Sequence, residues 1–451
     1  MWNRSSRRYS AATDNCYPKR GSKLRGRDVL AALIVVFWAT AAFKPWHCHA
    51  EEHGAPPGRR GAVIAEFTVE RDGAPLVIPV TMEVAAPGAP SGRRWSTFKM
   101  LLDTGAPCTL FDVAHRKELG APVRRSVMRS PFGALEIDIF QTPRMRFDRI
   151  EVQPRGGVAC LDLRHAMDII HEKIDGVLGM DVLFAMVVSI DFDEGRVCIH
   201  RAADPAVGRP VPIDRNSGKF AGCPVVRGAV ADRPPMEFLV DTGGSGMFAG
   251  GIDGPTYDRL TDDRLIIPSW RTREAKFVNG NVQVKLGRSR AFAIGDDVHR
   301  GLIFGRLPIC ALGLGFLSRY FVVFDFPKNV MYLRPGKGFS RPDHLDLSAM
   351  EIARFASSVA VLSLTEGGPA ATAGIRKGDQ ILTIDGTEVE KTTVMAIRRV
   401  LSETGHHRLG IRRGQAYYEA VVDLKDELWG VRGVDADNEH AESRESAGRR
   451  P

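Results

Sequence analysis

Short runs in which apolar and polar residues alternate dominate the chain from residue 62 onward. Residues 62–70 and 76–84 show this pattern on either side of a turn at Arg71–Pro75. A period of two is typical of strands buried on one face. Further runs of this kind occupy residues 98–102, 135–140, 144–152 and 187–192. One short helix is indicated over Asp112–Gly120, with Gly120 as its stop. The pattern predicts a mainly β fold.

The same pattern occurs twice in the chain. LLDTG at 101–105 is followed by GVLGMDVL at 176–183, and FLVDTG at 238–243 is followed by CALGLGFL at 310–317. When Gly179 is aligned with Gly313, the later residues Leu183, Val188, Asp191 and Phe192 fall on Leu317, Val322, Asp325 and Phe326. The alternative, two unrelated tight turns, does not account for this agreement. We predict two copies of one β-rich unit, joined near residues 201–222.

The net charge of +8 is concentrated at the N-terminus, where residues 1–50 hold nine Lys or Arg and two acids. The remaining chain is nearly neutral, so no nucleic-acid partner is predicted. The basic segment leads into an apolar run, Val29–Phe43, which is short for a bilayer of roughly 30 Å. Small residues follow at Cys48–Ala50.

This arrangement predicts a signal peptide or N-terminal anchor over residues 1–50 and a linker over 51–61. A buried core helix is the alternative for the apolar run. Export would place the protein in the periplasm, outside the cell, or anchored and facing away from the cytoplasm. Membrane contact would be limited to an uncleaved N-terminal segment.

Five cysteines follow the leader: Cys108, Cys160, Cys198, Cys223 and Cys310. Because the number is odd, at least one is free or pairs outside the chain. Buried free thiols and particular disulfides both remain open. No pair has the spacing of a zinc site, so no metal is predicted.

The Asp-Thr-Gly repeats carry the candidate chemistry. An aspartate after a buried strand, followed by Thr-Gly, forms a tight turn that presents its carboxylate in a crevice. Two such turns facing each other bring together two carboxyls that share one proton. One is then a base and the other an acid, so a water between them can attack a carbonyl. This chemistry requires no cofactor.

Residues 62–334 resemble an aspartic protease of the pepsin/retropepsin class with both lobes in one chain, lobe 1 at 62–205 and lobe 2 at 206–345. The resemblance implies that Asp103 and Asp241 are catalytic. It implies support within the turns from Thr104, Gly105, Thr242 and Gly243, with the two threonines hydrogen-bonded across the lobes. It implies packing behind the turns by Val177, Leu178, Gly179, Ala311, Leu312 and Gly313.

Some positions depart from the family's pattern. The residue after each turn is often Ser or Thr in the family, whereas this chain has Ala106 and Gly244. Residues 127–140 fit the family's flap hairpin, with Phe132 and Gly133 near the tip and no flap tyrosine. The dipeptide Asn279-Gly280 marks a second hairpin. A two-flap arrangement is therefore expected.

The stretch GGPAATAGIRKGDQILTIDG at 367–386 closely resembles a PDZ domain, expected over residues 346–426 with a disordered tail at 427–451. Such domains add a peptide as a strand and capture its terminal carboxylate. The carboxylate loop is expected near Ser348–Glu351, where it lacks the usual glycine and Glu351 would repel a carboxylate. Carboxylate capture therefore stays open, and a brace on the body is the alternative role.

Taken together, these features predict an exported aspartic endopeptidase with a polypeptide substrate and a PDZ domain for peptide binding or regulation. The alternative is a catalytically inactive peptide-binding scaffold with a protease-like body. A third reading has each lobe pairing with a second chain.

Overall fold

The structure is a computed structural model that describes residues 63–426, apart from short gaps at 87, 89–91, 131–132, 149, 153–155, 201, 204–206, 218–219, 221, 278–279 and 356–357. The expected leader, linker and C-terminal tail lie outside the described residues. Within the described ranges, no helix is long and apolar enough to cross a membrane.

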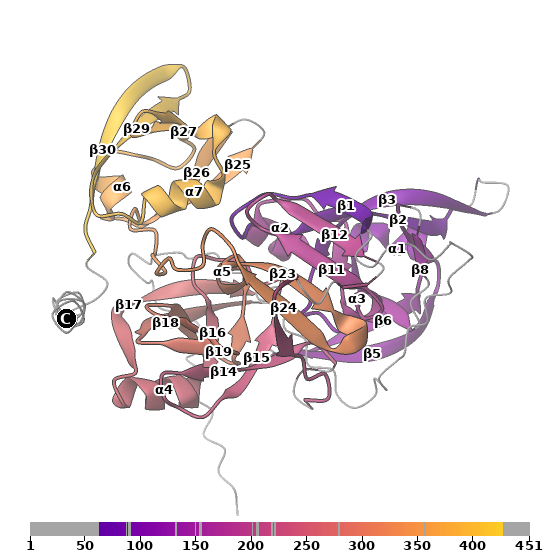
Figure 1. Cartoon of the computed structure of the whole chain (residues 1–451). Helices are drawn as coiled ribbons and strands as arrows, with labels where there is room; N and C mark the ends of the chain where they lie inside the picture. Colours follow the sequence, from indigo (N-terminus) through magenta and orange to yellow (C-terminus); the bar gives the residue numbers. More distant parts are fainter. Residues whose placement is uncertain are drawn as a thin grey trace, which may run out of the picture.

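The first of two nine-stranded sheets holds the strands of the N-terminal half in the order β5-β6-β9-β4-β10-β3-β2-β7-β8 (Figure 1). Its strands are β2 Val77–Ala85, β3 Arg93–Leu102, β4 Leu110–Asp112, β5 Pro122–Ser130, β6 Gly133–Gln141, β7 Met145–Phe147, β8 Ile150–Val152, β9 Gly157–Leu161 and β10 Gly176–Leu178. The alternation read from the sequence is visible in β2, where Ile78, Val80, Met82 and Val84 are buried.

The second nine-stranded sheet has the order β17-β18-β21-β16-β22-β15-β14-β19-β20, which is the first order with every strand number raised by twelve. Its strands are β14 Val225–Val230, β15 Met236–Val240, β16 Gly250–Asp253, β17 Ile266–Phe277, β18 Gly280–Ser289, β19 Phe292–Ile294, β20 Asp297–His299, β21 Ile303–Leu307 and β22 Ala311–Leu312. The two halves therefore repeat one topology, as the duplicated sequence pattern predicts.

A six-stranded sheet of order β1-β12-β11-β23-β24-β13 joins the halves. Its strands are β1 Val63–Thr68, β12 Arg196–His200, β11 Val187–Asp191, β23 Tyr320–Asp325, β24 Val330–Pro335 and β13 Arg209–Pro212. The central pair is antiparallel, with Ser189 opposite Val323. Each half supplies the same kind of hairpin to this sheet, so the repeat units meet through their shared Val-rich strands.

Helices in these two halves, which we call the body (residues 63–335), are short. They are α1 Arg116–Leu119, α2 Arg164–Ile170, α3 Met180–Leu183, α4 Gly254–Asp262 and α5 Leu314–Leu317. The helix expected over Asp112–Gly120 is present as a 3-10 turn at Val113–His115 followed by α1. The Asp112 side chain accepts from the Ala114 N–H, and Gly120 ends the segment at φ +87°.

One expected strand, residues 144–152, is instead the hairpin of β7 and β8. The chain reverses at Asp148, whose φ of +51° lies in the left-handed region. Aspartate tolerates this conformation better than most residues. Asp148 therefore permits a turn inside a run of residues that otherwise reads as one strand.

The C-terminal unit is a separate sheet of order β25-β26-β27-β29-β30, with β28 paired to β27. Its elements are β25 Met350–Phe355, β26 Ser358–Leu364, α6 Pro369–Thr372, β27 Gln380–Ile384, β28 Thr387–Glu388, α7 Val394–Val400, β29 Gly405–Arg413 and β30 Ala416–Leu424. α7 begins after its N-cap Thr393, whose side chain accepts from the Ala396 N–H.

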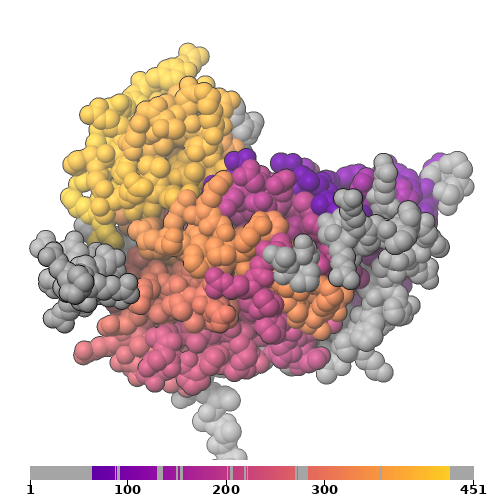
Figure 2. Space-filling model, viewed as in Figure 1, coloured from indigo at the N-terminus to yellow at the C-terminus, as the bar shows by residue number. Residues whose placement is uncertain are grey.

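The C-terminal unit rests on the N-terminal half of the body (Figures 1 and 2). Asp72 accepts a hydrogen bond from the Thr393 hydroxyl at 3.0 Å and pairs with Arg399 at 3.4 Å. Glu70 accepts from the Val394 N–H at 3.4 Å. These contacts place two body carboxylates at the N-terminal end of α7.

Candidate active site

Each Asp-Thr-Gly turn begins where a central strand ends. Asp103 follows β3, and its N–H donates to the Leu178 carbonyl at 3.1 Å. Asp241 follows β15, and its N–H donates to the Leu312 carbonyl at 2.9 Å. In both halves the partner strand runs parallel to the strand that carries the aspartate. Val177–Leu178 and Ala311–Leu312 thus lie beside the turns, as expected.

The two glycines that follow these partner strands permit a close approach of backbone to backbone. A Cβ atom at Gly179 would lie 2.5 Å from the Cys108 carbonyl carbon. A Cβ atom at Gly313 would lie 2.6 Å from the Gly244 carbonyl oxygen. Neither position has room for a side chain, so both glycines are required to seat the turns.

The threonines of the two turns hydrogen-bond across the halves, as the sequence reading expects. The Thr104 N–H donates to the Thr242 hydroxyl at 2.9 Å, and the Thr242 N–H donates to the Thr104 hydroxyl at 3.1 Å. Each hydroxyl in turn donates to a carbonyl of the opposite strand, that of Val240 or Leu102, at 2.6 and 2.9 Å. All four bonds are buried, so they fix the relative position of the two aspartates.

Both carboxyls are buried, with Asp103 0% and Asp241 1% exposed. Asp103 Oδ1 accepts from the Gly105 N–H at 2.7 Å, and Asp241 Oδ1 accepts from the N–H groups of Gly243 and Gly244 at 2.9 and 3.0 Å. A Cβ atom at Gly243 would lie 2.5 Å from Asp103 Oδ2, so the Asp103 carboxyl touches the opposite turn. Across the described residues, neither Oδ2 atom receives a hydrogen bond from a further donor.

This environment favours the protonated form of both carboxyls. Burial raises the pKa of Asp103 to about 7, although the N–H groups of Gly105 and Ala106 oppose the shift. Burial also raises the pKa of Asp241 well above its usual range, and the negative charge of Asp103 raises it further. The arrangement therefore suits a pair of carboxyls that share one proton.

The structure explains why a glycine, Gly244, follows the second Asp-Thr-Gly turn. A Cβ atom there would lie 3.2 Å from Asp241 Oδ2, and the Gly244 N–H binds the other oxygen of the same carboxyl. A backbone donor thus replaces the expected hydroxyl. Ser245 lines a recess of about 10 Å³ beside Asp241.

Both expected hairpins are present. β5 pairs with β6 up to Ser130 and Gly133, and β17 pairs with β18 up to Phe277 and Gly280. Phe132 lies outside the described residues, so its role as a flap residue stays a prediction. Gly133 opens β6, as a residue at the hairpin tip should.

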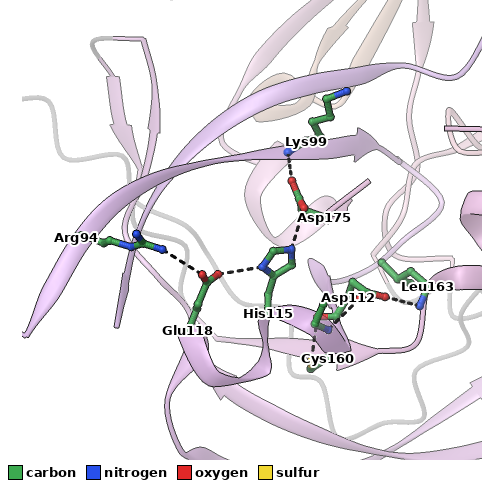
Figure 3. A network of polar contacts seen from close by, with 9 residues as sticks. Arg94, Lys99, Asp112, His115, Glu118, Cys160, Leu163 and Asp175 are labelled. Carbon is green, nitrogen blue, oxygen red and sulfur yellow. Dashed lines mark hydrogen bonds and ion pairs between the residues drawn. The ribbon is translucent and has the colours of Figure 1, made fainter. Parts of the chain in front are cut away.

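A polar network behind the first turn escaped the sequence reading (Figure 3). His115 Nε2 lies 2.8 Å from Asp175 Oδ1, and its Nδ1 lies 3.0 Å from Glu118 Oε2. The other Asp175 oxygen accepts from the Lys99 N–H at 2.8 Å. Since Asp175 immediately precedes β10 and Lys99 lies in β3, the network holds together the two strands that seat Asp103. Only long-range contacts reveal it, because its members are up to 76 residues apart.

Cys108, Cys160, Cys198, Cys223 and Cys310 form no disulfide in the structure, and all but Cys198 are buried. Cys108, which follows Asp103 closely in sequence, is among the buried ones, and burial raises its pKa. This supports a packing role. Among the described residues, no group of three or more His, Cys, Asp or Glu side chains is placed to hold a metal ion.

Comparison with known proteins identifies part of the C-terminal unit. Residues 361–413 match the family model of the PDZ domain. These residues form a PDZ domain. We use this name below for the whole sheet, residues 350–424. The PDZ domain predicted from the stretch at 367–386 is confirmed by this match.

Two further comparisons were made for the whole chain. No curated protein matched it. Among solved structures, the photosystem II D1 C-terminal processing protease matches at 26% identity, covering 18% of this chain and 23% of that chain, with a TM-score of 0.17. The matched part therefore spans about a quarter of that protease.

Proposed function

We propose that the protein is an exported aspartic endopeptidase in which Asp103 and Asp241 activate the attacking water. The observation that carries this proposal is the pair of Asp-Thr-Gly turns, which four buried hydrogen bonds hold against each other. Two adjacent buried carboxyls oppose folding at neutral pH, because each resists ionisation. A site that keeps such a costly pair is a candidate for acid–base chemistry.

The proposed division of labour follows from the hydrogen bonds. The N–H groups of Gly105, Gly243 and Gly244 occupy the two Oδ1 atoms, which leaves the Oδ2 atoms for a water. One carboxyl of the pair is ionised and removes a proton from this water, while the other retains the shared proton and donates it toward the oxygen of the peptide carbonyl. The hairpins β5–β6 and β17–β18 serve as the two flaps.

The test is hydrolysis of an unfolded protein by the full chain between pH 3 and 8. Asp103→Asn and Asp241→Asn should each lower kcat/KM by at least about a thousandfold, since either change removes one half of the acid–base pair. Asp258→Asn, an exposed position that pairs with Arg306, is the matched control and should retain activity. Cleavage that persists in both active-site variants rejects the assignment.

A wild-type protein that binds peptides but cleaves none would instead support the peptide-binding scaffold. The PDZ domain is a peptide-binding module in either case.

The pH profile provides an independent check on the dyad. Because burial raises both carboxyl pKa values, the acid limb of the kcat/KM profile should lie well above pH 4, toward the value of about 7 for Asp103. A limb at pH 4 or below would show that the carboxyls are solvated in the working enzyme.

Export rests on the N-terminal basic and apolar segments alone. Protease protection of intact cells, with N-terminal sequencing of the mature chain, distinguishes a cleaved signal peptide from an anchor. Recovery of the uncleaved chain in the cytoplasm would reject export.

A further inference from the structure

A cavity of about 440 Å³ lies between the PDZ domain and the body. The PDZ wall consists of β25 and α7, with Ile352, Arg354, Val394, Met395 and Arg398 among its residues. Figure 1 shows α7 on the side of the domain that faces the body. The body wall includes two apolar stretches, at residues 73–77 and 169–170. Charged residues such as Glu70 and Glu172 also line the cavity, and a groove of mixed polarity beside a strand suits an extended polypeptide.

β25 offers a free sheet edge to this cavity. It is the end strand of the PDZ sheet, paired with β26 on one side only within the described residues. The Ile352 carbonyl points to the other side, where it accepts from the Arg398 guanidinium on α7 at 3.2 Å. An end strand with outward carbonyl and N–H groups can pair with an added peptide strand.

The loop that precedes β25 is already occupied by the protein's own acid. Asp346 Oδ1 accepts from the Ser348 N–H at 2.8 Å and from the Ser348 hydroxyl at 2.5 Å. The Ser348 hydroxyl oxygen also lies 3.4 Å from the Met350 N–H, which donates to it. In the expected carboxylate loop, the N–H groups of Ser348 and Met350 are therefore already engaged by the protein itself. Asp346 is 7% exposed, so a carboxylate cannot displace it without uncovering a buried charge.

A second buried acid, Glu351, lies at the end of the same loop. Glu351 is buried, accepts from the Ser363 hydroxyl at 2.9 Å and lies 3.4 Å from His171 of the body. Together with Asp346 it places two buried carboxylates in the segment 346–351, which contains the expected carboxylate loop. Negative charges in this segment oppose the binding of a chain terminus.

The cavity also adjoins the candidate active site. Ser245 and Gly246, which follow the Asp241 turn, line the cavity on the side of the body. Ser245 in addition lines the recess beside Asp241. On the other side, Val77 lies opposite Leu101, two residues before Asp103. An extended chain in the cavity is therefore directed toward the two aspartates by residues that belong to both places.

We propose that the groove between β25 and α7 binds an internal, extended segment of the polypeptide whose neighbouring residues enter the dyad, and that it does not select a free C-terminus. Pairing with the outer edge of β25 supplies the affinity, and the apolar walls accept every second side chain. Peptide capture by this groove is independent of hydrolysis, whereas its role for substrate rests on the proposed function.

The experiment measures fluorescence anisotropy of a labelled peptide of about twelve alternating apolar and polar residues, long enough to span the cavity as a strand. It is made with a free C-terminus and with a C-terminal amide. Binding is measured on the full chain carrying Asp103→Asn and Asp241→Asn, which prevents cleavage. We expect the two peptides to bind with affinities equal within about twofold, and a free-acid preference of tenfold or more would overturn the proposal.

Two further substitutions locate the binding site. Met395→Asp, at a partly exposed position of α7 on the cavity wall, should weaken binding at least about tenfold. Val421→Asp is the matched control, since Val421 is exposed on β30, the end strand at the opposite edge of the same sheet. Loss of binding with Val421→Asp only, or no saturable binding of either peptide, would overturn the proposal.

A substitution in the loop should create a preference for a free C-terminus that the parent protein lacks. Asp346→Ala frees the Ser348 N–H and removes one negative charge, so a preference for the free-acid peptide should appear. A circular dichroism spectrum equal to that of the parent shows that the variant is folded. If a folded variant still ignores the carboxylate, the loop is not what excludes it, and the proposal fails at this step.

If the proposed proteolysis is real, Met395→Asp in the active chain should raise KM for a long unfolded substrate and leave kcat unchanged. If the chain hydrolyses nothing, the binding experiment still decides the nature of the groove. The two failures are therefore distinguishable.

Discussion

The two halves of the body share one strand order but fill their interiors differently. At four equivalent register positions, the second half has Phe238, Phe292, Phe304 and Phe316, and the first half has Met100, Met145, Val158 and Val182. All eight side chains are buried. In the second half Phe292 contacts the other three rings at centroid distances of 5.3 to 5.6 Å.

The support of the Asp-Thr-Gly turns differs as well. In the first half Asp175 precedes β10 and joins the polar network with His115, whereas Ile309 occupies the equivalent place before β22 and is buried. What both halves retain is the turn and its backbone hydrogen bonds. The comparison shows that the site depends on strand ends, glycines and threonines, and that either a polar or an aromatic interior can hold them.

The largest expected effect tests the aromatic interior. Phe292→Ala should lower the free energy of unfolding by about 3–5 kcal/mol, since it creates a cavity and removes three ring contacts. Met145→Ala, at the equivalent position of the first half, should cost less, about 2–4 kcal/mol. Urea denaturation measures both, and an equal or larger loss for Met145→Ala would show that the rings add nothing beyond their volume.

The next effect tests what the halves have in common. Thr104→Val and Thr242→Val each leave a buried N–H and a buried carbonyl without their partner hydroxyl, so each should cost about 2–4 kcal/mol. Because the bonds are reciprocal, the two losses should agree closely, and the double variant should cost less than their sum. Unequal losses of unfolding free energy for the two single variants would indicate that one threonine contributes more than the other to joining the turns.

A third prediction concerns pH. The folded-state pKa of Asp103, about 7, lies above its ordinary value of 3.8, so the dyad costs nothing below pH 4 and destabilises the fold increasingly as the pH rises toward 7. Asp103→Asn should remove this loss, which is at most about 4 kcal/mol by the shift in pKa. The unfolding free energies of wild type and variant should therefore diverge between pH 4 and 7, in favour of the variant.

Asp241→Asn is the matched variant from the other half. Its profile should flatten in the same direction, because either substitution removes the pair of adjacent buried carboxyls. A steeper profile in either variant would contradict the shared-proton arrangement.

The sequence predicts the parts of this molecule that are encoded in consecutive residues. Asp103–Gly105, Asp241–Gly243 and the two glycines behind them occur in short motifs, because a tight turn and a close backbone approach permit few residue types. The β-rich repeat and the PDZ domain follow for the same reason. Equivalent core positions such as Met145 and Phe292 cannot be matched from sequence, since a core constrains volume more than identity.

What the sequence does not predict depends on contacts between distant segments. Asp346 looks like an ordinary loop residue until the structure shows its carboxylate on the Ser348 N–H. The cavity between the PDZ domain and the body cannot be predicted from sequence either, because its walls come from five separate parts of the chain. The reversal at Asp148 was missed for a local reason: a single left-handed residue leaves no periodicity signal.

The smallest expected effect tests the polar network of the first half. His115→Gln keeps a hydrogen-bonding side chain but cannot reach both Asp175 and Glu118, which His115 contacts with its two ring nitrogens. The expected loss is about 1 kcal/mol, since the histidine is only partly buried and one bond can be retained. His115→Leu should cost more, because it leaves Asp175 with the Lys99 N–H as its remaining partner among these residues. If both variants unfold at the wild-type urea concentration, the first half is held by its apolar core alone, and the contrast between the two interiors reduces to the size of their side chains.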